Sequence, residues 1–219
     1  MARNSKDVIA AIHDRAGVTI EIIPGAEEAR LAYQAAQTSL GSPAGSSVVF
    51  DTGGGSTQFT FGHGSDVDER FSVDVGAARH TEGFGLASAV TPDTLRDAFA
   101  AISVDLTRLD GRPTPETIIA MGGVVTNMTA VAHGLATNDA DVVNGAVLES
   151  SEIDRQIERY RSMDADPRRT IVGLQPKRAE VILADACIVR TVLEKLGGTS
   201  VLVSDRGLRH GMLAERFGS

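Results

Sequence analysis

The chain has 219 residues, of which 42% are apolar and 23% charged, and its formal net charge is −8. This composition is typical of a globular protein with a continuous core and excludes the disordered and fibrous classes. The negative charge argues against broad binding to nucleic acid or to anionic membranes, because both demand a surplus of Lys and Arg. A phosphate-bearing ligand stays compatible with it, since backbone amides and a bound cation hold phosphates locally.

The sequence carries no signal for a membrane or an export route. No apolar run reaches the length of about 18 residues that a spanning helix needs, and the polar opening MARNSKD lacks the apolar core of a secretory signal. We therefore expect a cytoplasmic protein without a membrane partner. The single cysteine, Cys187, lies in an apolar stretch, which predicts a buried reduced thiol and not a nucleophile.

The first quarter of the chain alternates helical and extended patterns. Apolar residues at three-and-four spacing predict an amphipathic helix over 7–16. A β-branched run over 18–23 predicts a strand that stops at Pro24, and an Ala- and Glu-rich run predicts a helix over 27–37. The Gly- and Ser-rich segment 38–47 is predicted to be a loop.

The middle of the chain contains three short β-rich runs separated by turn residues, which predict a three-stranded meander over 48–51, 58–61 and 70–75. Thr91 followed by Pro92 predicts a capped helix that runs to about residue 109. A buried strand over 118–121 then ends in two glycines before a helix that reaches about residue 133.

The last third is predominantly helical. A capping-box pattern at 151–154 predicts a helix start, and residues 177–195 predict a long buried helix. A final strand over 200–203 precedes one more helix. The order of these elements predicts an α/β domain with a mixed central sheet and helices on both faces.

The most informative stretch is VVFDTGGGSTQFTF, in which a buried strand ends at Asp51 and a glycine-rich turn leads into a second strand. A strand-terminal aspartate can hold a hydrated divalent cation, and consecutive glycines let backbone N–H groups approach a phosphate. The same residues also fit a plain β-hairpin turn in which the aspartate caps its own backbone. Spacing alone leaves both readings open.

Six collinear segments together are specific for one family: IIPGAEEARLAYQ from Ile22, the loop at Asp51, VDVGAARHTEGF from Val73, MGGVVTN from Met121, LQPKRAEVILADA from Leu174 and SDRGLRHG from Ser204. With them the chain resembles the exopolyphosphatase and guanosine pentaphosphate phosphohydrolase (Ppx/GppA) family over nearly its whole length. The resemblance implies the actin-like ATPase, or ribonuclease H-like, fold. It also implies a phosphohydrolase that uses Mg²⁺ and acts on polyphosphate or guanosine pentaphosphate, and it implies that homodimers can form.

The resemblance also assigns roles to individual residues. Glu28 would be the general base for the attacking water, with Glu27 as the alternative, and Asp51 would be the metal ligand. Without the resemblance, both glutamates fit the solvated first turn of a helix. The residues that would surround phosphate oxygens are Gly53, Gly54, Gly55, Ser56, Thr57, Gly122 and Gly123.

Three arginines lie in matching segments and could reach an anionic substrate, although surface or helix-end ion pairs are the more common role of such residues. They are Arg178, Arg206 and Arg209. None of the five histidines has the spacing of a metal-ligand pair, so none is assigned to a metal.

The chain departs from the family pattern at two positions in the site. Gln58 stands where the family's loop ends in a glutamate, which predicts weaker metal binding. Val124 stands where the second glycine motif usually has threonine, which removes one hydroxyl donor. Both departures leave a phosphohydrolase and a non-catalytic phosphate- or nucleotide-binding module as competing functions. A sugar- or acetate-kinase type of phosphotransferase shares the fold but lacks the EEAR and SDRG segments.

Domain organisation follows from the same resemblance. Family members begin with a lobe that carries a DxGSN-type phosphate loop, and this chain contains no such motif. We therefore expect residues 1–219 to form a single lobe, with 1–47 as the incoming segment from a preceding lobe.

Overall fold

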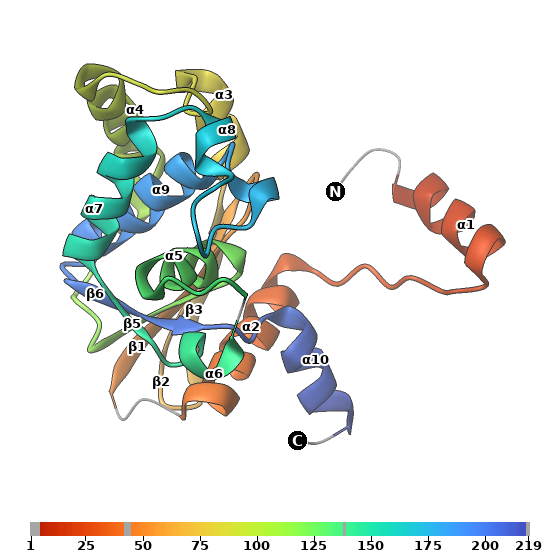
Figure 1. The fold of residues 1–219 in the computed structure, drawn as a ribbon. Coiled ribbons are helices and arrows are strands. Elements are labelled where there is room, and N and C mark those ends of the chain that lie inside the picture. Colours follow the sequence, from red (N-terminus) through yellow and green to blue (C-terminus); the bar gives the residue numbers. More distant parts are fainter. Residues whose placement is uncertain (1–4, 42–44, 138, 218–219) are drawn as a thin grey trace.

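A computed structural model describes residues 5–41, 45–137 and 139–217, and these form an α/β domain around a six-stranded mixed sheet (Figure 1). The strand order is β3-β2-β1-β4-β6-β5, so the predicted mixed sheet is confirmed. The predicted meander over the first three strands is confirmed as well. The strands are β1 (Ser46–Thr52), β2 (Thr57–His63), β3 (Asp66–Val73), β4 (Thr117–Met121), β5 (Val147–Glu149) and β6 (Ser200–Ser204).

Three strands in the middle of the sheet run parallel. β1 pairs with β4 and β4 pairs with β6 in parallel, whereas β2, β3 and β5 pair antiparallel with their neighbours. In this register Asp51 lies beside Met121, and Met121 lies beside Ser204. The carboxyl ends of the parallel strands therefore meet at one edge, which is where ligands bind in open α/β sheets.

The helices cover both faces of the sheet, as the sequence predicts. Those in the body are α2 (Gly25–Leu40), α3 (Ala77–Phe84), α4 (Pro92–Asp105), α5 (Gly123–His133), α6 (Ala140–Val143), α7 (Ser150–Arg161), α8 (Ala165–Arg168), α9 (Ile182–Lys195) and α10 (Leu208–Phe217). The predicted N-cap of α4 is confirmed, because the Thr91 hydroxyl accepts from Thr94 N at 3.2 Å and Pro92 opens the helix.

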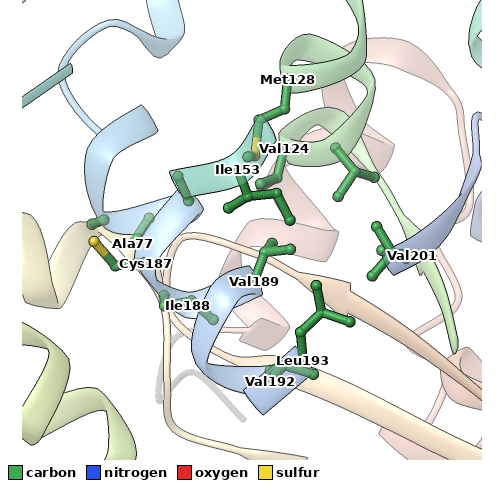
Figure 2. Close-up of a cluster of buried hydrophobic side chains, with 14 of the residues drawn as sticks. Ala77, Val124, Met128, Ile153, Cys187, Ile188, Val189, Val192, Leu193 and Val201 are labelled. Atoms are coloured by element: carbon green, nitrogen blue, oxygen red, sulfur yellow. The ribbon is translucent and has the colours of Figure 1, made fainter. Parts of the chain in front are cut away.

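One face of the sheet carries the large core. Val48 and Phe50 of β1 pack there with buried side chains of β4, β6 and the helices α3, α4, α5, α7 and α9. Figure 2 shows the part of this core in which α9 residues meet Val124 and Met128 of α5, Ile153 of α7 and Val201 of β6. Cys187 is fully buried in this cluster and burial raises the pKa of its thiol, so the predicted buried, unpaired thiol is confirmed.

The opposite face carries a much smaller core. Val49, Ile119 and Met121 alternate with the residues of the large core along their strands and pack against Tyr33 of α2. Helix α10 lies against α2, and the backbone of Leu31 comes so close to Gly211 that a side chain there would collide with it. Helix α2 thus covers the small core, and α10 packs against α2.

The N-terminal segment lies apart from the body. Helix α1 (Ser5–Ala16), predicted from its periodicity, is joined to α2 by an extended stretch (Figure 1). The strand predicted over 18–23 is wrong, because this stretch pairs with no strand among the described residues and Val18, Ile20 and Ile22 stay exposed. A β-branched pattern forms a strand only where a sheet edge receives it.

Several predicted boundaries are also wrong. The predicted loop 38–47 is shortened at both ends, since α2 continues to Leu40 and β1 begins at Ser46, and residues 42–44 lie outside the described part. Strand β3 begins and ends earlier than 70–75.

Two predicted helix starts are wrong as well. The predicted capping box at 151–154 does not form, because α7 begins at Ser150 without a side-chain cap. The predicted helix 177–195 is a 3₁₀ turn over Pro176–Arg178 followed by α9. Pro176 fits the start of such a turn.

The sequence patterns missed four short elements: α3, α6, β5 and α8. Each spans eight residues or fewer, which is shorter than the window in which a periodicity can be detected. Among the described residues, no helix is both long and apolar enough to cross a membrane.

Candidate active site

Asp51 marks the centre of the candidate site. It lies near the carboxyl end of β1 and directly opposite Gln58 of β2, so the two side chains share the sheet face that α2 covers. Burial raises the pKa of the Asp51 carboxyl to about 6, with a smaller contribution from the negative charge of Glu28, and Arg178 partly offsets both. The Asp51 carboxylate is therefore influenced by a negative charge from α2 and by a positive charge from Arg178.

Glu28, in the first turn of α2, is the acidic residue whose charge acts on Asp51. The two glutamates of the EEAR segment have different partners, which separates the two predicted candidates. Glu27 accepts a hydrogen bond from Arg30 Nε at 2.9 Å, and this bond lowers its pKa, so its carboxylate is committed to a salt bridge on the helix surface. The charge of Glu28 therefore acts on Asp51, whereas that of Glu27 is paired with Arg30.

The predicted phosphate loop, residues 53–57, is a tight connection between β1 and β2. Gly53 N donates to Ser56 O at 2.9 Å and closes the turn. Gly53, Gly54 and Gly55 are exposed, and within the described chain the N–H groups of Gly54, Gly55 and Ser56 donate to no protein acceptor. Unpaired N–H groups on successive residues form an anion-binding surface.

Thr57 differs from the rest of the predicted loop. Its side chain is fully buried, and its hydroxyl donates to Val75 O at 2.8 Å. This donor is therefore already used inside the protein. Thr57 ties the base of the loop to the chain after β3, whereas its four predecessors line the exposed side.

Hydrogen bonds from the start of α3 fix the position of the loop. Ala77 N and Ala78 N donate to Gly53 O at 3.2 Å and Gly54 O at 2.9 Å. Gly76 must be a glycine, because a Cβ there would collide with the backbone of Gly54 and Gly55. With their carbonyl groups turned toward α3, the loop residues present their N–H groups on the opposite side. The sequence signal for this brace is Gly76 before a short Ala-rich run, and the periodicity analysis did not detect it.

The second predicted glycine turn approaches Asp51 from β4. Gly122 has φ +90°, which L-residues rarely adopt, and a Cβ there would lie 3.3 Å from the Asp51 Cγ and closer still to Oδ1. It precedes α5, which starts at Gly123. A Cβ at Gly123 would lie 3.0 Å from the Arg178 Cζ. The two glycines thus leave room for a carboxylate on one side and a guanidinium on the other.

Only one of the three predicted arginines is placed at Asp51. Arg178 acts on the Asp51 carboxyl and is 29% exposed. Arg206 forms an ion pair with its neighbour Asp205 at 3.3 Å, and Arg209 is exposed on α10. Arg178 is therefore the cation that can act on an anion at this edge of the sheet.

The two departures from the family pattern have different structural consequences. Gln58 lies opposite Asp51, and its Nε2 donates to the Ser56 hydroxyl oxygen at 3.0 Å, so a neutral amide occupies the place of a second carboxylate. Val124 points away from the site into the large core beside Met128 and Ile153 (Figure 2). Gln58 thus affects the site directly, whereas Val124 contributes to packing.

The donor set for a metal is small. Over residues 5–41, 45–137 and 139–217 there is no group of three or more His, Cys, Asp or Glu side chains that could hold an ion. Asp51, with Glu28 nearby, is the acidic pair present at the site. This set fits Mg²⁺, which is commonly held by one or two carboxylates together with water and substrate phosphates.

The sheet order and the placement of the site at the carboxyl ends of its parallel strands are those of an actin-like α/β domain. A family model described as "Ppx/GppA phosphatase family" matches residues 1–219. The chain belongs to the Ppx/GppA phosphatase family.

The chain is similar to relatives that are named for two activities. It is 29% identical over 206 residues to "Exopolyphosphatase 2" of Mycobacterium tuberculosis, which covers 90% of this chain and 63% of that protein. It is also 29% identical to the "Guanosine-5'-triphosphate,3'-diphosphate pyrophosphatase" of Photobacterium profundum, over 98% of this chain and 42% of that protein. The chain thus spans less than two thirds of the length of each of these two relatives.

The fold agrees with solved structures of the family. A crystal structure of the Ppx/GppA phosphatase from Aquifex aeolicus, the type II variant, superposes with a TM-score of 0.87 at 30% identity. The superposition covers 99% of this chain and 71% of that one. The predicted actin-like fold is confirmed.

Proposed function

We propose that this chain provides the phosphohydrolase site of a protein that releases terminal phosphate from inorganic polyphosphate or guanosine pentaphosphate. The observation that carries the proposal is the convergence at Asp51: a second carboxylate, Glu28, and a guanidinium, Arg178, act on it beside a loop with free N–H groups. Family membership and relatives named for both activities support it.

Glu28 is proposed to act on the attacking water. A carboxylate at the edge of the site can orient water in line with a phosphoryl group and accept its proton, which contributes about 10²- to 10⁴-fold in rate. Glu27 is unsuited to this task, because Arg30 already binds its carboxylate.

The remaining residues are proposed to bind charge. Phosphoryl transfer depends mainly on positioning and on electrostatic stabilisation of the phosphoryl oxygens. The N–H groups of Gly54, Gly55 and Ser56 provide neutral donors, and Arg178 provides a positive charge on the side of Gly123. Gly122 and Gly123 leave the space that this arrangement needs.

Mg²⁺ is the proposed cofactor, with Asp51 as its protein ligand. When bound, it would neutralise phosphate charge and stabilise the developing charge of the leaving group. The raised pKa of Asp51 fits this assignment, because a buried carboxylate next to another negative charge is stabilised by a cation. The cytoplasmic location, the homodimer and the absence of nucleic acid and membrane partners stay predictions.

The proposal is tested by measuring phosphate release from long-chain polyphosphate and from guanosine pentaphosphate, each with Mg²⁺ and with excess chelator. We expect release from at least one substrate in Mg²⁺ and none in chelator. The ratio of the two rates in Mg²⁺ then assigns the substrate. A correctly folded protein that releases phosphate from neither substrate would overturn the proposal and leave a phosphate-binding module.

A further inference from the structure

A buried carboxylate lies behind the site and is not explained by packing. Asp185 is in the first turn of α9, and its side chain has no exposed surface among core residues such as Leu183 and Ala186. Its Oδ1 atom is buried and has no hydrogen-bond partner in the described chain. A buried carboxylate with an unsatisfied oxygen costs stability, and an apolar residue of similar size would avoid that cost.

The other oxygen of Asp185 faces Arg178, with 3.4 Å between Oδ2 and Nη1. The same guanidinium lies over Gly123, so closely that a Cβ there would lie 3.0 Å from Cζ and 3.3 Å from Nε. Arg178 thus touches the interior through Asp185 and the candidate site through the start of α5. The side chain is 29% exposed, and its Nε and Nη2 atoms donate to no acceptor among the described residues.

Arg178 interacts with two carboxylates that have different roles. On one side its charge acts on Asp51, the proposed metal ligand, and on the other side it meets Asp185. A flexible cation near a single carboxylate would pair with it directly and would neutralise the charge that a metal needs. A second carboxylate, buried and fixed on a helix, competes for the same guanidinium and holds it away from Asp51.

We propose that Asp185 is a positioning residue that holds the Arg178 guanidinium against Gly123, where its free N–H groups bind a phosphate oxygen while Asp51 stays free for the cation. This inference rests on the proposed function for the identity of the anion. It assigns to Asp185 a role in ligand binding that acts entirely through Arg178.

The test is a double-mutant cycle on the binding of inorganic tripolyphosphate in Mg²⁺ at pH 8. All proteins carry Glu28→Gln to suppress turnover, and calorimetry compares the parent with Asp185→Asn, Arg178→Gln and the double variant. We expect Asp185→Asn to weaken binding about 5- to 30-fold, within the usual range for coupled neighbours. The double variant should bind no more weakly than Arg178→Gln alone, because Asp185 acts through Arg178.

Two controls separate positioning from general damage. Asp154→Asn removes the same charge from the exposed ion pair that Asp154 forms with Arg190 of α9 at 2.8 Å, and it should leave tripolyphosphate affinity unchanged. Arg178→Lys keeps the charge at a partly exposed position but lacks the planar fork. It should weaken binding, and adding Asp185→Asn should weaken it by less than the effect of Asp185→Asn in the parent. If Asp185→Asn does not fold, Asp185→Ala takes its place in both cycles, with the same expected outcomes.

The outcomes are distinct from those of the proposed function. Unchanged affinity in Asp185→Asn, additive effects in the cycle, or no tripolyphosphate binding by the parent would each overturn the positioning role. Coupled binding in a protein that releases no phosphate would sink the hydrolase and keep the inference. Phosphate release by the wild type, together with additive effects of the Asp185 and Arg178 substitutions on binding, would keep the hydrolase and overturn the inference.

Discussion

The two faces of β1 differ in what their residues do. Val48 and Phe50 point into the large core beneath α9, and both are essentially without exposed surface. Val49 and Asp51 alternate with them and point to the small face under α2, where the strand ends in a carboxylate instead of an apolar side chain. One strand therefore anchors the fold on one side and carries the candidate chemistry on the other.

This division shows why the site tolerates an unfavourable charge arrangement. Most buried apolar side chains lie in the large core, on the face opposite α2, so the α2 face can hold carboxylates without interrupting that core. Asp51 is partly desolvated and near another negative charge, a combination that raises its pKa and costs stability in the absence of a ligand. Substitutions on the α2 face should therefore lower activity with little loss of stability. Substitutions in the large core should lower stability with little loss of activity per folded molecule.

The largest expected effect on the α2 face comes from Glu28→Gln. Removing the proposed base should lower phosphate release by about 10²- to 10⁴-fold, while the free energy of unfolding stays close to wild type. Glu27→Gln is the matched control, because it makes the same change one residue earlier and removes only the ion pair with Arg30. Equal losses in both variants would show that the pair acts through the helix and not through a positioned base. Initial rates and denaturant unfolding measure the two quantities.

On the opposite face, Phe50→Ala should show the reverse profile. Phe50 is fully buried and stacks with Phe59 at a centroid separation of 5.9 Å, so the cavity should cost about 3–5 kcal/mol of unfolding free energy. The activity per folded molecule should change little. Phe217→Ala, at a side chain that is 77% exposed, provides the control with no measurable loss of stability. A specific activity that falls in parallel with stability would break the distinction between the faces.

Asp185 gives a prediction for the dependence of stability on pH. Burial raises its pKa to about 7 despite the attraction of Arg178. The folded state therefore keeps a proton that the unfolded chain releases near pH 4, and stability falls as pH rises from about 4 to about 7.

Asp185→Asn should remove this contribution. Relative to wild type, the variant should gain on the order of 1–3 kcal/mol of unfolding free energy at pH 8, and the gain should be absent at pH 4. Urea unfolding at both pH values measures it. A gain of the same size at both pH values would show that the side chain does not titrate in this window.

The smallest effect is expected from Gln58→Glu, which restores a carboxylate opposite Asp51. The added charge should lower the Mg²⁺ concentration for half-maximal activity by about two- to tenfold, or roughly 0.4–1.4 kcal/mol. Gln34→Glu adds the same charge at an exposed position of α2 and should leave this concentration unchanged. An Mg²⁺ requirement that does not change in Gln58→Glu would place the ion away from the Asp51–Gln58 pair.

Much of the fold was predictable because its patterns are local. Period-two and period-3.6 repeats locate β1, β2, β4, β6 and the helices α1, α2, α4 and α5, and turn glycines separate them. The strand predicted at 18–23 failed because pairing depends on a partner, which the local pattern does not contain. The short elements α3 and β5 were missed because tertiary contacts stabilise them more than their own propensities do.

The sequence predicts which residue types form the candidate site. It does not predict the surrounding residues that hold them in position. Asp51 and the loop glycines stand out because a strand, a carboxylate and consecutive glycines follow one another. The choice of Glu28 depended on family resemblance, and the ion pair of Glu27 with Arg30 supplies a physical reason only in three dimensions. Gly76 supports loop residues more than 20 positions earlier in the chain, and Asp185 contacts Arg178, which lies in the 3₁₀ turn before α9. Local periodicity therefore detects neither role.

The most direct test of the account is to measure Mg²⁺-dependent phosphate release and thermal unfolding of Asp51→Asn in the same preparation. We predict that release is lost while the metal-free protein is at least as stable as wild type at pH 8, because the variant removes a desolvated charge beside Glu28. Retained release, or a loss of release matched by a loss of stability, would contradict the assignment of Asp51 as the centre of the site.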